Sequence, residues 1–270
     1  MKPYRIGIVG YSFGRIHAEA YRQIPFYLDV GAPVELVGVA TSRPETARQA
    51  QAEAGFTLAT ADWRELVASP DVDIIHVCTP DDLHHPIAAA ALAAGKHVYC
   101  EKPLARTVGE AEDLYDRARA SGRVAQIAFQ MRFGSAVQAA RRLIRDGTLG
   151  EITSFRLTFL HSGYEDPERP LTWRLDSART GGGVLYDLGS HAVDLLTLPA
   201  DNDRYHPLVL DDHPLDRAVE AHGVTEARGE GLAQQADAPF GVHVPHVHAL
   251  GHLGAVADGH RPPGQPGRRL

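Results

Sequence analysis

Short apolar runs alternate with longer amphipathic stretches through roughly the first half of the chain. Runs typical of buried strands occupy residues 4–9, 34–40, 57–59, 73–78, 96–100 and 124–129. Helical patterns fill the intervals, at residues 14–27, 44–54, 63–69, 85–95 and from 108 onward. Strands that alternate with helices in this way predict right-handed crossovers and a parallel sheet covered on both faces, which is a doubly wound α/β domain.

Capping residues mark several of the predicted helix ends. Asp62 stands directly before the helix at 63–69, where its carboxylate caps the first turn. Thr107 and Glu110 have the spacing of a capping box, and Gly95 closes the helix at 85–95. These signals support the predicted boundaries between helices and strands.

The pattern changes after residue 126. A helix is predicted over residues 135–147, and EITSFRLTF at 151–159 alternates as a half-buried antiparallel strand does. We therefore expect an α/β domain over residues 1–126 and an incomplete α/β domain with a mainly antiparallel sheet over residues 127–198. A tail of different character follows over residues 199–270.

The tail has an unusual composition. Residues 201–270 contain no Ile, Lys, Ser, Met, Cys or Trp, and they hold more than half of the 15 histidines. Such a segment has few residues able to build a core, so we expect it to be poorly ordered. Its richness in Arg, Gly, Pro and Ala favours the interpretation that it is a frameshift or truncation product.

Composition narrows the class of ligand. The net charge of -7 and the pI near 6.1 argue against nonspecific binding of nucleic acid or an anionic membrane and favour a small soluble ligand. Cys78 and Cys100 follow apolar runs without a spaced framework, so both are expected to be buried free thiols. No charged leader precedes a long apolar run, and no stretch approaches the roughly 20 apolar residues of a membrane span. These features predict a cytoplasmic protein.

The first strand ends at GYSFG, residues 10–14. A dinucleotide site needs small residues where the turn is tight and where the backbone approaches pyrophosphate, and Gly10, Ser12 and Gly14 suit that need. The same letters also fit the G-x-S-x-G elbow of serine hydrolases, with Ser12 as nucleophile. Ligands of doubly wound sheets bind beyond the carboxyl ends of the strands, so candidate site residues are those just after each strand.

The second strand is followed by Thr41, Ser42 and Arg43. An acidic residue at this place would bind the adenosine ribose, whereas an arginine with hydroxyl neighbours suits a 2'-phosphate. This favours NADP over NAD as the cofactor. The alternative is an ordinary loop with a solvated arginine.

Two later segments carry more specific motifs. Residues 77–105 place Thr79 and Pro80 after one strand and the sequence Glu-Lys-Pro, residues 101–103, after the next. Residues 181–196 place three glycines ahead of Asp187 and His191, four residues apart, which is the spacing of one helical face.

These segments resemble the Gfo/Idh/MocA family of NAD(P)-dependent oxidoreductases, which act mostly on sugars, cyclitols and related polyols. The matching stretches are G-x-x-H at 14–17, TP-x(3)-H at 79–84, AGKHV-x-CEKP at 94–103, QMRF at 130–133, WR at 173–174 and GGG-x(3)-D-x(3)-H at 181–191. The resemblance covers roughly residues 1–198. It implies a Rossmann-type doubly wound parallel sheet followed by an α/β domain with a large, mainly antiparallel sheet.

The resemblance also implies roles for individual residues. Lys102 and His191 are the implied proton-transfer residues, and Asp187 supports them. Oxidation of a secondary alcohol needs a base for the hydroxyl proton while C4 of nicotinamide accepts the hydride. The alternatives are a solvated strand-end lysine and a helix-surface Asp187–His191 hydrogen bond. His17 and Asp194 are expected to be structural residues.

The remaining expectations concern the cofactor and partners. The candidate cofactor-binding residues are Gly10, Ser12, Phe13, Gly14, Thr41, Ser42, Arg43, Thr79, Pro80, His84, Glu101, Lys102 and Arg132. We expect a small sugar or polyol substrate, NADP or NAD as cofactor, no metal, no nucleic acid and no membrane; the family implies a homo-oligomer. The alternative from another class is a dinucleotide-binding protein without turnover, because the second domain is incomplete.

Overall fold

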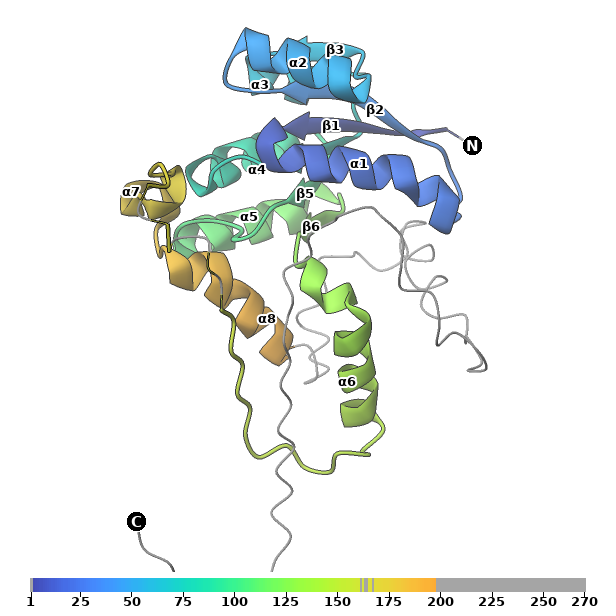
Figure 1. The fold of residues 1–270 in the computed structure, drawn as a ribbon. Helices are drawn as coiled ribbons and strands as arrows, with labels where there is room; N and C mark the ends of the chain where they lie inside the picture. The colour runs from blue at the N-terminus through green and yellow to red at the C-terminus, as the bar shows by residue number, and fades with distance from the viewer. Residues whose placement is uncertain (1, 161, 163–164, 167, 198–270) are drawn as a thin grey trace, which may run out of the picture. The chain divides into compact units, whose positions relative to one another are not determined.

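A six-stranded parallel sheet forms the centre of the fold. The computed structural model describes residues 2–160, 162, 165–166 and 168–197. The strands are β1 (Tyr4–Val9), β2 (Val34–Ala40), β3 (Leu58–Thr60), β4 (Ile74–Val77), β5 (His97–Cys100) and β6 (Ala125–Ile127). Their order is β3-β2-β1-β4-β5-β6, with every neighbouring pair parallel (Figure 1). This confirms the doubly wound sheet, and the order is that of dinucleotide-binding folds, with its switch point between β1 and β4.

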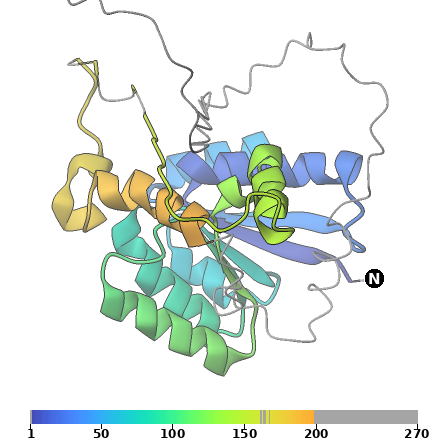
Figure 2. The same ribbon diagram turned by 90° about the horizontal axis from the view of Figure 1, so that it is seen from below.

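Two layers of helices cover the sheet. Helices α1 (Tyr11–Tyr27) and α2 (Pro44–Ala54) pack on one face, and α3 (Trp63–Ala68), α4 (His84–Ala93) and α5 (Val108–Ser121) pack on the other (Figure 2). Side chains alternate along β1: Ile6 and Ile8 join the core under α1 and α2, and Val9 joins the core under α3 to α5. Both faces of the sheet are therefore buried, as the unbroken apolar runs predict.

The predicted capping signals are confirmed with one difference. Asp62 accepts a hydrogen bond from the backbone N–H of Arg64, and Thr107 accepts one from the N–H of Glu110. The Glu110 carboxylate does not complete the box, because it accepts from the backbone N–H and the guanidinium of Arg106 instead. Gly95 has the positive φ of 70° that ends α4.

The predicted start of the first helix was wrong by three residues. Helix α1 begins at Tyr11, so that Ser12 and Phe13 lie in its first turn instead of in a preceding loop. The helix starts immediately after Gly10 because this residue makes the whole turn at a φ of 89°. The spacing of apolar residues does not carry that information.

Regular structure is sparser after β6. Helix α6 (Ser135–Arg145) confirms the predicted helix, and the chain later forms α7 (Ser177–Thr180), a π-helical turn (Leu185–Gly189) and α8 (Ser190–Thr197). The strand predicted at residues 151–159 is absent: these residues have no regular secondary structure. A strand exists only through pairing with a neighbour, and no described segment pairs with this one. The antiparallel sheet is thus not seen among the described residues, and the tail at 199–270 lies outside them.

Two further sequence expectations concern burial. Cys78 and Cys100 are both buried free thiols, as predicted. Among the described residues, no helix has the length and apolar character needed to cross a membrane.

Candidate functional site

The glycine loop lies at the switch point of the sheet. A Cβ at Gly10 would meet the carbonyl oxygen of Cys78 at 2.5 Å, so the loop after β1 presses directly against the end of β4. A Cβ at Gly14 would meet Cγ2 of Ile8 at 2.5 Å, which shows how closely α1 packs on β1. Among the described residues no side chain caps α1, and Ser12 is exposed in its first turn. The N–H groups of that turn are therefore free to bind an anion.

The residues after β2 form a tight turn. The hydroxyl of Thr41 donates to the backbone carbonyl of Arg43 at 2.8 Å, and its oxygen lies 2.6 Å from that of Thr46. Arg43 itself is exposed at the start of α2. Thr41 thus shapes the turn, while Ser42 and Arg43 face solvent at the carboxyl edge of the sheet.

Thr79 and Asp81 follow β4. The hydroxyl of Thr79 is buried and has no hydrogen-bond partner among the described residues. Asp81 is 6% exposed, and burial raises the pKa of its carboxyl to about 7, with Lys102 acting in the opposite direction. Asp81 was not among the predicted site residues, although it stands directly after Thr79 and Pro80 at a strand end, where site residues are expected.

Lys102 follows β5 and reaches across to the second part of the chain. Its Nζ donates to the Oδ1 atom of Asp187 at 2.5 Å and to the backbone carbonyl of Asp187 at 2.8 Å. The Nε atom of Arg174 lies 3.8 Å from the other carboxylate oxygen. The lysine side chain is only 10% exposed, which argues against the alternative of a solvated strand-end lysine.

His191 lies in α8 and is almost fully buried, with 4% of its surface exposed. Its ring stacks on Phe159 and meets the ring of Phe129 edge-on. Burial and the nearby charge of Lys102 lower the pKa of His191, and its Nδ1 atom has no hydrogen-bond partner among the described residues. The carboxylate of Asp187 is directed to Lys102, so the i, i+4 spacing does not by itself define the partner of His191.

Two of the predicted cofactor residues are held by internal contacts. His84 is fully buried, with Nδ1 at 2.7 Å from the Pro103 carbonyl oxygen and Nε2 at 2.9 Å from that of Thr79. The guanidinium of Arg132 binds both carboxylate oxygens of Asp194 through Nε at 2.7 Å, and Asp194 is 5% exposed. These contacts join the ends of β4 and β5 to each other and α8 to the segment after β6.

His17, expected only to pack near the loop, reaches Glu101. Its Nε2 atom lies 2.8 Å from the Glu101 carboxylate, and its Nδ1 atom lies 3.0 Å from Nδ1 of His76. His17, His76 and Cys78 each have a ligand-type atom within 4.8 Å of the others, the grouping expected of a metal site. Hydrogen bonds already account for both nitrogens of both rings, because Nε2 of His76 pairs with the Tyr21 hydroxyl at 2.8 Å.

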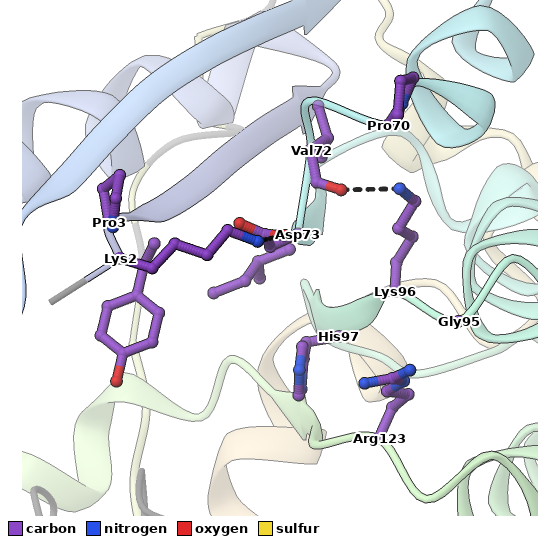
Figure 3. A pocket seen from close by; sticks show the side chains of 11 residues that line it. Lys2, Pro3, Pro70, Val72, Asp73, Gly95, Lys96, His97 and Arg123 are labelled. Carbon is purple, nitrogen blue, oxygen red and sulfur yellow. Dashed lines mark hydrogen bonds and ion pairs between the residues drawn. The ribbon is translucent and has the colours of Figure 1, made fainter.

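A separate hollow of about 380 Å³ lies at the opposite, amino-terminal edge of the sheet (Figure 3). Three of its charged groups are paired within the protein: Lys96 donates to the Ser69 and Val72 carbonyl oxygens at 2.7 Å, and Asp73 binds Lys2. Ligands of doubly wound sheets bind at the carboxyl edge, where the glycine loop, Lys102 and His191 lie. The candidate site is therefore that edge and not this hollow.

The strand order and the glycine turn with an open helix end define the class of protein: a Rossmann-type dinucleotide-binding fold. The comparison with protein families agrees and is more specific. Residues 4–129 match the oxidoreductase family with an NAD-binding Rossmann fold, and residues 137–201 match the GFO/IDH/MocA C-terminal domain. The chain belongs to the Gfo/Idh/MocA family of oxidoreductases. The serine hydrolase alternative for Ser12 thus finds no support.

The names of individual relatives agree with this family. The chain is 39% identical over 198 residues to levoglucosan dehydrogenase of Pseudarthrobacter phenanthrenivorans, covering 72% of this chain and 50% of that protein. It is 33% identical to 1,5-anhydro-D-fructose reductase of Ensifer adhaerens, covering 70% of this chain and 53% of that protein. The chain spans about half the length of these relatives.

Solved structures extend the comparison to the fold. A levoglucosan dehydrogenase in complex with NADH and levoglucosan matches with a TM-score of 0.71 and 37% identity, covering 73% of this chain and 54% of that one. An oxidoreductase domain protein from Kribbella flavida matches with a TM-score of 0.71 and 39% identity, covering 74% and 54% of the two chains.

Proposed function

We propose that the chain carries the dinucleotide-binding domain (residues 1–126) and part of the substrate domain (127–198) of an NAD(P)-dependent oxidoreductase. The reaction moves a hydride between the nicotinamide and a secondary alcohol carbon of a sugar, cyclitol or related polyol. The observation that carries the proposal is the ion pair of Lys102 with Asp187 beside the buried His191, at the carboxyl edge of the sheet. Relatives named for levoglucosan and 1,5-anhydro-D-fructose support a compact carbohydrate as substrate.

The described residues fit a dinucleotide. The N-terminus of α1, which no described side chain caps, offers N–H groups for the pyrophosphate. Because Gly10 has no Cβ, the loop packs closely against the end of β4 and leaves room for the ligand. The buried, unpartnered hydroxyl of Thr79 lies at the end of the strand beside this loop, where a ligand would satisfy it. The bound cofactor supplies the hydride acceptor at its nicotinamide C4 atom.

Lys102 and His191 have different roles: Lys102 orients the substrate alcohol, and His191 transfers its proton. The Lys102 amine, held by Asp187, donates a hydrogen bond to the substrate oxygen and orients the alcohol. The pKa of His191 is lowered, so this histidine is neutral near pH 7. Its Nδ1 atom, which has no partner among the described residues, is available to accept the proton of the substrate hydroxyl. In the reverse direction the same histidine returns the proton to the alkoxide.

The cofactor preference follows from the turn after β2. Arg43 is exposed at the start of α2 with Ser42 beside it, so a 2'-phosphate would meet a cation and a hydroxyl there. We therefore propose NADP as the preferred cofactor, with NAD as the alternative that the NADH complex of the relative favours.

The test is a titration with NADH and NADPH, followed by nicotinamide fluorescence, for the wild type and Arg43→Ala. NADPH should bind at micromolar concentrations and weaken about tenfold or more in the variant, while NADH binding changes little. Turnover is then measured with NADP or NAD and a panel of anhydrosugars, aldoses and inositols, with Lys102→Met as the inactive control. Failure of folded protein to bind either dinucleotide would refute the proposal.

A further inference from the structure

A chain of hydrogen bonds runs through the protein interior and ends at Glu101, the residue before Lys102. The Tyr21 hydroxyl lies 2.8 Å from Nε2 of His76, whose Nδ1 lies 3.0 Å from Nδ1 of His17. Nε2 of His17 then lies 2.8 Å from Oε1 of Glu101. We refer to these four residues as the His17 chain. His76 is 2% and Glu101 8% exposed, so the Glu101 end is shielded from water.

The direction of the last hydrogen bond follows from the groups involved. A carboxylate only accepts, so Nε2 of His17 carries the proton that is donated to Glu101. Burial lowers the pKa of His76 well below its ordinary value, so this ring is neutral and offers one donor and one acceptor. In the tautomer of His17 with its proton on Nε2, Nδ1 is an acceptor, so His76 donates to it from Nδ1 and accepts from the Tyr21 hydroxyl at Nε2. These contacts fix the plane of the His17 ring.

The second carboxylate oxygen of Glu101 contacts the backbone of Lys102. Oε2 accepts from the backbone N–H of Lys102 at 3.3 Å, while the Glu101 backbone N–H donates to the Val77 carbonyl at 2.9 Å. The Glu101 carboxylate is thus held between helix α1 and the main chain of Lys102. His17 binds one oxygen of this carboxylate, and the backbone N–H of Lys102 binds the other.

We propose that His17 is a positioning residue for Lys102, acting through the carboxylate of Glu101. The proposal rests on the proposed function only for the role of the Lys102 amine. Nζ of Lys102 meets two atoms of Asp187 at once, so a shift of its main chain would disturb the geometry of both contacts. A histidine that only satisfied buried polar atoms would stabilise the fold without a specific effect on Lys102.

The chemical reactivity of lysine distinguishes these two roles. The chain has three lysines, Lys2, Lys96 and Lys102, so each amine is assignable by peptide mass spectrometry after brief acetylation with acetic anhydride. Lys2 is exposed and serves as the reference. Lys96 is bound to two backbone carbonyls at the opposite edge of the sheet and reports general loosening of the fold.

The variants are His17→Leu, which removes the donor to Glu101, and His17→Gln, whose side-chain amide restores it. We expect acetylation of Lys102 relative to Lys2 to rise at least threefold in His17→Leu, with Lys96 unchanged, and to return near the wild-type value in His17→Gln. Tyr21→Phe removes only the hydrogen bond to His76, at the opposite end of the His17 chain from Glu101. It should therefore raise the acetylation of Lys102 relative to Lys2 less than His17→Leu does. This variant serves as the test if His17→Leu does not fold.

Other outcomes overturn the proposal. An unchanged Lys102 ratio in the folded variants would show that His17 does not hold Lys102, and a parallel rise at Lys96 would show that its role is general stability. The measurement needs neither cofactor nor substrate, so it stands independently of whether the chain turns over a sugar. Where turnover is measurable, His17→Leu should lower kcat with little change in the KM for the dinucleotide.

Discussion

The side-chain amine of Lys102 donates to the carboxylate of Asp187 at 2.5 Å, although 85 residues separate them in the sequence. This ion pair joins the end of β5 to the π-helical turn Leu185–Gly189. The amine also donates to the backbone carbonyl of Asp187, so both the side chain and the main chain of that turn are involved. The pair is the clearest link between the two motifs that the sequence analysis singled out.

Asp187→Asn tests this link. The amide keeps the shape of the carboxylate but removes the charge opposite Lys102, so we expect kcat/KM to fall by roughly 10- to 100-fold with little change in dinucleotide binding. The free energy of unfolding should fall by about 1 to 3 kcal/mol, because the buried amine loses its counter-charge. Steady-state kinetics, fluorescence titration and urea unfolding measure the three quantities.

Asp113→Asn is the matched control for the stability measurement. Asp113 pairs with Arg117 at 2.7 Å and with His85 at 2.8 Å, but its side chain is 40% exposed. Exposed pairs contribute little, so this change should cost less than about 1 kcal/mol and leave kinetics unaltered. Equal losses of stability in the two variants would mean that the Lys102–Asp187 pair is no more than a surface contact.

Local sequence signals predicted most of the parallel domain because each strand and helix there is specified within its own segment. The apolar run of β2 and the Pro44–Ala54 helix have the predicted ends, and Asp62 caps α3 as its position indicates. The Gly10 turn is different: its φ of 89° and its contact with Cys78 depend on β4, far along the chain. Spacing alone therefore placed the start of α1 three residues late.

In the site, too, the sequence motifs predicted which residues matter but not the contacts between distant segments. Motifs predicted Lys102, Asp187 and His191 as the chemically important residues, but not which atoms meet. His17 was predicted only as a structural residue, because its contact with Glu101 joins residues 84 positions apart in the sequence. Asp81 was not predicted, because its burial depends on how the chain packs around the end of β4. The strand predicted at residues 151–159 is not seen among the described residues, because alternation describes a strand's faces but not the partner it must pair with.

Asp81 makes a specific contribution to the pH dependence of stability. Burial raises the pKa of its carboxyl from 3.8 to about 7, so the folded protein binds this proton more tightly than the unfolded chain does. The contribution is full below about pH 4 and is lost as the pH rises to about 7. The difference in unfolding free energy between wild type and Asp81→Asn should fall across this window, by at most about 4 kcal/mol.

Urea unfolding at pH 4, 5.5, 7 and 8 measures that difference. The variant carries a neutral amide at every pH, so only the wild type changes with this group. Asp82→Asn is the control on the neighbouring residue, whose carboxylate pairs with Arg179 at 3.3 Å and is 26% exposed. A wild-type to Asp81→Asn difference that is constant from pH 4 to 8 would show that Asp81 is ionised in the folded protein throughout.

The Arg132–Asp194 pair should respond unequally to the loss of either partner. The Asp194 side chain is 3% exposed, whereas Arg132 is 22% exposed and can reach water when alone. Arg132→Leu leaves a buried carboxylate unpaired and should cost about 3 to 5 kcal/mol; Asp194→Leu should cost less. Urea unfolding of the two single variants and the double variant checks this order, and a larger loss for Asp194→Leu would contradict it.

Gly14→Ala tests the close packing of α1 on β1. The added Cβ would meet Cγ2 of Ile8 at 2.5 Å, and Ile8 is fully buried, so the helix must move away from the sheet. We expect a loss of about 1 to 3 kcal/mol in unfolding free energy and weaker NADPH binding, since the first turn of α1 moves with the helix.

Gly109→Ala is its matched control, because Gly109 lies inside α5 and no atom of the residues that the structure describes lies within 4 Å of an added Cβ there. Alanine favours the helix over glycine by up to about 1 kcal/mol, so this variant should be neutral or more stable and bind NADPH like the wild type. The two variants add the same methyl group to a helical glycine and are predicted to change stability in opposite directions. A Gly14→Ala protein with wild-type stability and binding would mean that α1 has room to adjust, and the tight approach of the helix to β1 would then not be what requires glycine at this position.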